Sequence, residues 1–221
     1  EQELKNSYEK EFGGPLDYDQ LSQKERSKLL QKYSTFYVFG GEESYGYLPT
    51  DSVRDKDGNA ASLIFCEMVA SLKKEGRTVL DYLDSLYLQF GYFLESLGQI
   101  VYDGAAGAAK IENILKSYRL NPPTEFLGAN VSKFTDFGVE TVVDADGKEI
   151  PKQDLYFLRL ENGYRYAVRG SGTEPKIKFY LFGSESVADE SALEAAKSKT
   201  RENLERLKEA ILNDANHRSE N

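Results

Sequence analysis

Helical spacing of apolar residues marks the first part of the chain, and strand-type alternation marks the second. Residues 60–74 and 79–90 have apolar positions three and four apart, which predicts two amphipathic helices. The first is expected to bury Leu63, Ile64, Met68, Val69 and Leu72, and the second Leu80, Leu83, Leu86 and Tyr87. Beyond them strands alternate with helices, so we place a domain boundary between residues 91 and 92.

Charged segments precede this helical pair. Residues 1–11 predict a short helix that the glycines and proline at 13–15 end. Ser22 with Glu25 forms a capping box for a second helix that runs to about residue 32. The aromatic and β-branched run 35–39 predicts a strand, followed by a polar loop. We infer no functional role for the segment 13–32 from the sequence.

The second part predicts an α+β domain. A strand at 96–102 and a helix at 105–118 come first, and the turn signal Asn162–Gly163 pairs residues 155–160 with 164–168 as a hairpin. A strand at 176–183 precedes a last helix, capped by Ser191 with Glu194, whose tail after Asn213 is expected to fray. Its core stripe is predicted to be Leu193, Ala196, Thr200, Leu204, Leu207 and Ile211.

These patterns define the expected fold class. Residues 1–91 are expected to be a partial α/β domain, and residues 92–221 an α+β domain with a largely antiparallel sheet packed by helices.

Composition narrows the possible partners. A net charge of -9 and a pI near 4.9 argue against nucleic acid, because no basic stripe is present to displace counterions from a phosphate backbone. No apolar run approaches membrane-spanning length, so no membrane partner is expected. The single Cys66 excludes a disulfide framework, which favours the cytoplasm. One Cys and one His exclude a structural zinc site, and the paired aspartates lie in turn signatures, so we predict no metal site.

The loop at 169–176, between two predicted strands, has the chemistry to hold a phosphate. Its glycines can turn backbone amides toward an anion, Ser171 and Thr173 offer hydroxyls, and Arg169 offers a planar fork. Lys176 and Lys178 lie on one face of the following strand, so one of them can add a charge. The alternative is a tight structural turn beside a solvated strand face, and the spacing alone does not separate the two.

A second polar loop follows the strand predicted at 35–39. Glu42, Glu43 and Ser44 beside glycines can exchange hydrogen bonds with the hydroxyls of a sugar. Capping or solvation of the glutamates is an equal alternative. Further on, Lys56 lies between Asp55 and Asp57; this is a charged turn before a helix, or, in a closed site, a group for proton transfer.

Three motifs together resemble a known family. GEESYG at 41–46, VRDKDG at 53–58 and YAVRGSGTEPKIK at 166–178 are similar in order and spacing to the third and fourth domains of the α-D-phosphohexomutases, the phosphoglucomutase and phosphomannomutase group. The resemblance implies a cytoplasmic isomerase, an intramolecular phosphotransferase that moves a phosphoryl group between C1 and C6 of a hexose. It proceeds through a phosphoserine and a bisphosphate intermediate.

The resemblance also implies roles for particular residues. Glu42 and Ser44 would bind sugar hydroxyls, and Lys56 would take part in proton transfer. The non-reacting phosphate would be held by Arg169, Ser171, Gly172, Thr173 and, of the two strand lysines, Lys178. The expected ligand is a hexose phosphate, and the sugar itself is not specified.

Two of the family's motifs are not found in these 221 residues. There is no Thr-x-Ser-His-Asn-Pro type sequence to carry a phosphoserine, and no Asp-Gly-Asp-x-Asp-Arg type sequence to bind a metal. Mg²⁺ is therefore expected in the full-length enzyme, with no ligands in this chain. The chain is expected to be a C-terminal part that works with N-terminal domains of the same polypeptide and is inactive alone. The alternatives are a stand-alone phosphosugar-binding module without catalysis, or a structural fragment.

Overall fold

A computed structural model describes residues 2–33, 37–42, 46–50, 53, 55–102, 104–144, 147–171 and 175–220. The chain divides into two compact units, residues 1–79 and 80–221, and each is described here by itself. The domain boundary expected between residues 91 and 92 stays a prediction. No helix in the described part of the chain is long and apolar enough to cross a membrane.

The first unit begins with the two predicted charged helices, α1 (Gln2–Phe12) and α2 (Gln23–Tyr33), with a short 3₁₀ turn η1 (Tyr18–Gln20) between them. The capping box is confirmed. Both the backbone N–H and the hydroxyl of Ser22 donate to Glu25 Oε2, at 2.9 and 2.6 Å, and the Glu25 N–H lies 3.4 Å from Ser22 Oγ. Lys32 Nζ donates to Glu11 Oε1 at 2.8 Å, which joins α2 to α1.

The strand predicted at 35–39 is displaced along the chain. Residues 37–39 have no regular structure, and residues 35 and 36 lie outside the described residues. A two-residue strand β1 (Gly40–Gly41) pairs instead with β2 (Tyr47–Leu48) in an antiparallel ladder. Tyr37 is not part of this ladder, but its hydroxyl donates a hydrogen bond to the carbonyl of Leu48 in β2. α3 (Gly58–Lys74) follows, with Asp57 as its N-cap.

The core stripes predicted for the two apolar helices are wrong in part. On α3 only Leu72 is buried, while Leu63 is 62% exposed and Ile64 44% exposed. On α4 (Val79–Phe90) Leu80 and Leu83 are exposed, and Tyr87 packs edge-on against Tyr92. Periodicity shows that a helix has an apolar face, but it does not supply the surface that covers it. In the first unit the two-residue β2 is too short to cover the 17 residues of α3.

The second unit is built on a six-stranded sheet in which every ladder is antiparallel, as expected. The spatial order is β3 (Tyr92–Val101), β8 (Lys176–Glu185), β7 (Arg165–Gly170), β6 (Leu155–Leu160), β5 (Ala129–Asp136) and β4 (Glu125–Phe126). The predicted hairpin is confirmed: the Leu160 N–H donates to the Tyr164 carbonyl at 2.9 Å, and Gly163 takes the left-handed conformation that its turn requires.

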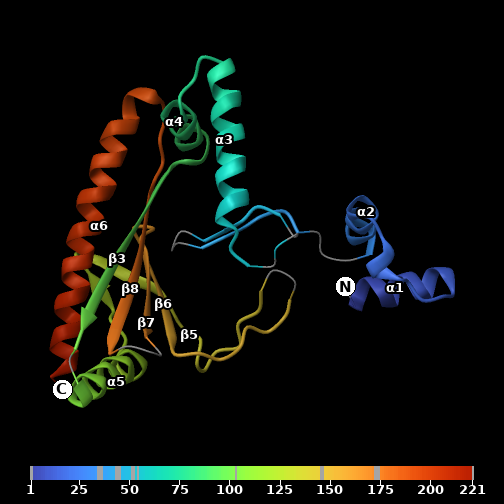
Figure 1. Cartoon of the computed structure of the whole chain (residues 1–221). Coiled ribbons are helices and arrows are strands. Elements are labelled where there is room, and N and C mark those ends of the chain that lie inside the picture. The colour runs from blue at the N-terminus through green and yellow to red at the C-terminus, as the bar shows by residue number, and fades with distance from the viewer. Residues whose placement is uncertain are drawn as a thin grey trace. The chain divides into compact units, whose positions relative to one another are not determined.

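Two helices cover one face of this sheet. Figure 1 shows α6 (Glu190–Ser219) running along β3 and β8, with α5 (Gly104–Leu120) near its C-terminal end. On β8 every second residue from Ile177 to Gly183 is buried. Three of them, Ile177, Phe179 and Leu181, share one core with the C-terminal part of the α6 stripe, Leu204, Leu207 and Ile211. All six residues predicted for that stripe are buried. On the other face, the described residues of this unit place no helix; we call it the open face.

Both ends of α6 differ from the prediction. Its N-cap is Asp189, whose carboxylate accepts hydrogen bonds from the Ala192 N–H and from the Ser191 hydroxyl. Ser191, the predicted N-cap, therefore donates to the actual N-cap residue. The helix also runs past Asn213 to Ser219 and does not fray there. Arg218 explains this: it donates to Asp214 Oδ2 at 2.7 Å, to Ser117 Oγ of α5 at 2.8 Å, and to the carbonyl of Asn121, just after α5, at 2.8 Å.

Candidate functional site

The predicted phosphate loop connects β7 to β8 and is held at both ends. The ladder register pairs Arg169 with Lys178 and Gly170 with Ile177, and the Ser171 N–H donates to the Lys176 carbonyl at 2.9 Å. Gly170 lies against α5, where an added Cβ would lie 3.2 Å from Leu115 Cδ1, so a larger residue would push the loop away from the helix. Gly172 and Thr173 lie outside the described residues.

Arg169 and Lys178 lie directly opposite each other on the open face of the sheet. Paired residues of an antiparallel ladder have Cβ atoms about 5 Å apart, so the two cationic side chains start from neighbouring points. Lys176 lies at the start of β8, two residues before Lys178, and is paired with Val101 of β3 on the other side of the strand. Lys178 is therefore the strand lysine that lies beside Arg169, and its role in holding a phosphate stays a prediction.

The surroundings of this pair suit an anion. Among the residues that the structure describes, no carboxylate forms an ion pair with Arg169 or Lys178, and like charges placed opposite each other repel. A phosphate between them would relieve that repulsion and accept from both. Lys178 Nζ also lies 5.9 Å from the ring centre of Tyr180. Sequence reasoning missed Tyr180, although its position two residues after Lys178 places it on the same face.

The predicted sugar loop of the first unit connects β1 to β2, and only its end residues Glu42 and Gly46 are among the described residues. The Glu42 N–H donates to the Gly46 carbonyl at 2.8 Å, and the Asp57 N–H donates to the Tyr47 carbonyl at 2.9 Å, which ties the turn to the start of α3. Lys56 Nζ lies 3.5 Å from Glu42 Oε1 and 3.2 Å from Asp55 Oδ1. The structure thus brings together Glu42 and Lys56, while Ser44 lies outside the described residues.

Gly46 makes this arrangement possible. It is buried, and a Cβ added there would lie 2.4 Å from Lys56 Cδ and 3.0 Å from Glu42 Oε2. Any side chain at this position would displace the Lys56 stem. The requirement for glycine in the motif therefore has a local steric cause.

Charge fixes the protonation of Lys56. A hydrogen bond to Asp55 and the charges of Asp55 and Glu42 raise the pKa of the Lys56 ammonium above its ordinary value. In this arrangement Lys56 keeps its proton at neutral pH, so it can donate a hydrogen bond or a proton and does not act as a base.

The residues present do not fit a metal site. Within the described part of the chain, no three His, Cys, Asp or Glu side chains come together in a group that could hold a metal ion. The Mg²⁺ that the family resemblance implies would need ligands that the described residues do not provide.

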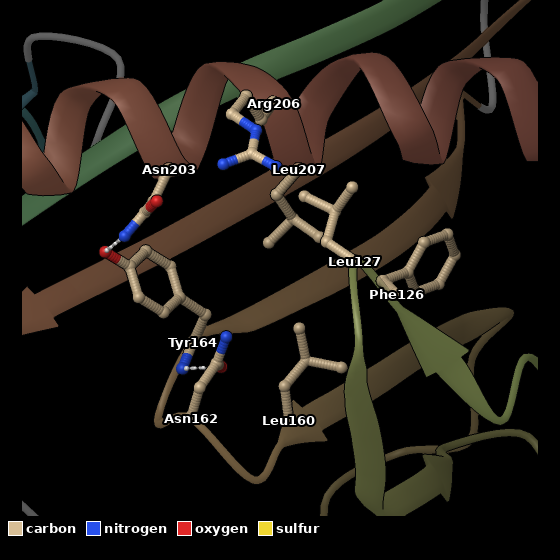
Figure 2. Close-up of a pocket in the computed structure, with 8 residues that line it drawn as sticks. All are labelled: Phe126, Leu127, Leu160, Asn162, Tyr164, Asn203, Arg206 and Leu207. Atoms are coloured by element: carbon tan, nitrogen blue, oxygen red, sulfur yellow. Dashed lines mark hydrogen bonds between the residues drawn. The ribbon is translucent and has the colours of Figure 1, made fainter.

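A small cavity lies at the other end of β7 (Figure 2). It is lined by apolar side chains from β4, β6 and α6, and its polar lining residues are Asn162, Tyr164, Asn203 and Arg206. The Tyr164 hydroxyl accepts from Asn203 Nδ2 at 3.3 Å. At about 100 Å³ the cavity is smaller than the roughly 300 Å³ typical of small-molecule sites, so we do not assign the sugar phosphate to it.

Comparison with known proteins gives consistent matches. Residues 26–90 match the family model described as phosphoglucomutase/phosphomannomutase, alpha/beta/alpha domain III. A probable phosphomannomutase of Haemophilus influenzae is 41% identical over 145 residues, and a phosphoglucomutase of Staphylococcus epidermidis is 37% identical over 150 residues. These alignments cover 65% and 66% of this chain but only 27% of each relative, so the chain spans about a quarter of the length of these proteins.

A solved structure is also similar. The exocytosis-sensitive phosphoprotein pp63/parafusin, a phosphoglucomutase from Paramecium in its open form, aligns with a TM-score of 0.48 and 24% identity, over 76% of this chain and 30% of that one. The family model and the two relatives share one family name, and it is the family that the three motifs predicted. These matches support the phosphoglucomutase/phosphomannomutase family for this chain.

Proposed function

We propose that this chain is the C-terminal part of a phosphoglucomutase/phosphomannomutase. The full-length enzyme would interconvert hexose 1-phosphate and hexose 6-phosphate in the cytoplasm, through a phosphoserine and a bisphosphate intermediate. This chain would supply sugar and distal-phosphate binding, and N-terminal domains of the same polypeptide would supply the serine and the Mg²⁺ loop. The observation that carries the proposal is the cross-strand pair of Arg169 and Lys178 beside the 169–176 loop.

The second unit binds the phosphate that does not react. Arg169 donates through its planar fork, Lys178 adds a point charge, and Ser171, Gly172 and Thr173 donate from the loop. Because both ends of the loop are fixed by the β7–β8 ladder, the anion is held in a defined position. Binding energy from this distal phosphate keeps the sugar in register during phosphoryl transfer.

The first unit binds the sugar. Glu42 accepts hydrogen bonds from hydroxyl groups, and Ser44 donates or accepts. Lys56, held protonated by Asp55 and Glu42, donates to a sugar oxygen and is the group for proton transfer. Mg²⁺, bound elsewhere in the full-length enzyme, would neutralise charge on the transferred phosphoryl group.

Calorimetric titration of glucose 1-phosphate into the chain tests this proposal. Loss of one charge-assisted contact corresponds to about 1.5–3 kcal/mol, so Arg169→Ala is expected to raise Kd by about tenfold to about a hundredfold. Arg201→Ala is the control, because Arg201 is exposed on α6 and has no ion pair among the described residues. Glucose without phosphate should bind more weakly than glucose 1-phosphate. Equal affinities of wild type and Arg169→Ala would contradict the proposal.

A further inference from the structure

A second row of cations crosses the open face of the sheet. The ladder register places Lys133 of β5 opposite Arg159 of β6, and Arg159 opposite Arg165 of β7. Directly paired residues point to the same side, and this is the side of Arg169, because residues 165 and 169 are separated by an even number of positions. The three strands lie side by side in Figure 1.

The described carboxylates do not pair with this row. Among the described residues, none of the three cations forms an ion pair, whereas Arg119, Lys197, Lys199 and Arg218 of the same unit all do. The row continues through Phe182 to Glu95, but that carboxylate lies two strands from Arg165, about 10 Å away at the usual strand spacing. Like charges directly opposite each other destabilise a ladder. In a chain with 37 acidic and 28 basic residues, an uncompensated basic row points to an anionic ligand.

Lys133 and Arg159 are exposed at the surface of the sheet, and Arg165 is partly removed from water. The Arg159 guanidinium lies 5.8 Å from the ring centre of Phe157, and that ring lies 6.3 Å from the ring of Phe182. Arg165 is half-buried, and its Nε is buried without a hydrogen-bond partner in the described structure. A buried donor without a partner is unfavourable, and an oxyanion bound at the guanidinium fork, after a small rotation of the side chain, would satisfy it.

The row is separate from the phosphate loop. Arg165 and Arg169 are four residues apart on one strand, which corresponds to about 13 Å. The two side chains would have to extend fully toward each other along the strand to share one phosphate. Between the two rows lie Phe157, Ala167 and Tyr180, which face one another across β6, β7 and β8 and carry no charge.

We propose that Lys133, Arg159 and Arg165 form a second phosphate-binding site on the open face of the sheet. Its ligand is a phosphomonoester group, either on a separate molecule or as the second phosphate of a bisphosphorylated sugar. The site does not depend on the first: it is defined by its own residues, and its failure can be distinguished from failure of the site at Arg169.

Site-resolved NMR titration of the whole chain with inorganic phosphate, at constant ionic strength made up with chloride, tests this proposal. Two separate groups of backbone amides should shift, one around residues 133, 159 and 165 and one around 169–178. The variant R159Q/R165Q should weaken binding at the first group at least tenfold and leave the second within twofold. The control R201Q/R206Q removes the same charge from exposed positions on α6 and should change neither.

The two sources of phosphate give different curves. With glucose 1,6-bisphosphate, one shared and tighter Kd for both groups identifies a spanning ligand, and two independent Kd values identify separate phosphates; either result supports the site. The proposal is overturned if the amides around 133, 159 and 165 do not shift, if chloride shifts them equally, or if R159Q/R165Q behaves like R201Q/R206Q. Shifts at this row without shifts at 169–178 would contradict the proposed function and leave the second site standing.

Discussion

Replacement of Arg218 by alanine is expected to destabilise the second unit strongly, although Arg218 lies close to the end of a helix. Its side chain is 15% exposed, donates to Asp214, Ser117 and the Asn121 carbonyl, and lies 4.8 Å from the ring centre of Tyr118. Arg218→Ala removes these contacts together and leaves Asp214 without this partner.

The magnitude follows from these contacts. Hydrogen bonds of a charged group contribute about 1.5–3 kcal/mol, and contact of the cation with the ring about 0.5–1 kcal/mol. Since the contacts share one side chain and are partly solvated, we expect a total loss of about 2–4 kcal/mol rather than the full sum. For a unit of about 140 residues, each kcal/mol lowers Tm by roughly 3 °C, so Tm should fall by about 6–12 °C.

Thermal unfolding followed by circular dichroism measures this change, and hydrogen exchange locates it. The amides of residues 213–219 should lose protection first, because Arg218 holds this last part of α6 on α5. Arg218→Lys should recover part of the loss, since it keeps the charge but not the fork. The matched control Arg201→Ala should stay within about 0.5 kcal/mol of wild type. A Tm for Arg218→Ala within 2 °C of wild type, with unchanged exchange at 213–219, would refute the reasoning.

Three other outcomes are expected. Gly46→Ala should weaken sugar binding without lowering the Tm of the second unit, because its Cβ would displace Lys56 from Glu42; unchanged affinity in a glucose 1-phosphate titration would argue against that arrangement. Hydrogen bonds from Ser191 and the Ala192 N–H lower the pKa of Asp189. Its stabilising contribution is therefore present above the unfolded pKa of about 3.9 and lost as pH falls through the lower folded pKa. Asp189→Asn keeps a cap but removes this titration, so its stability should vary less with pH below about 4, and parallel pH curves would contradict this. A polypeptide of residues 92–221 should melt cooperatively, because it contains the whole six-stranded sheet with α5 and α6, and a broad, non-cooperative transition would contradict the expected boundary.

Local signals in the sequence predicted local structure well. The Ser22–Glu25 capping box, the Asn162–Gly163 turn and the six-residue stripe of α6 are all confirmed, because each depends on residues a few positions apart or on one helix face. The cap of α6 was assigned to Ser191 instead of Asp189, since both are good cap residues and only the backbone conformation separates them. The sequence assigned Arg169 to the loop and Lys178 to the following strand, whereas in the structure Arg169 lies within β7 and pairs with Lys178 of β8.

Features that depend on contacts between distant residues could not be predicted. The end of α6 is held by Arg218 on Ser117, and a separation of about a hundred residues leaves no pattern in the sequence. The exposure of Leu63 and Ile64 depends on which other element covers α3, and the spacing of apolar residues within one helix does not predict that. The pairing of Lys133 with Arg159 could not be predicted from the sequence either, because the register of β5 on β6 is shifted between Val131 and Lys133.

A double-mutant cycle on Arg169 and Lys178 tests the central claim most directly. The claim is that these two side chains hold one phosphate, so glucose 1-phosphate is titrated into wild type, Arg169→Ala, Lys178→Ala and the double variant. Two groups on one anion should couple, with an interaction free energy of at least about 0.5 kcal/mol, and each single variant should bind at least about fivefold more weakly than wild type. Additive effects, or single variants that bind as tightly as wild type, would contradict the account.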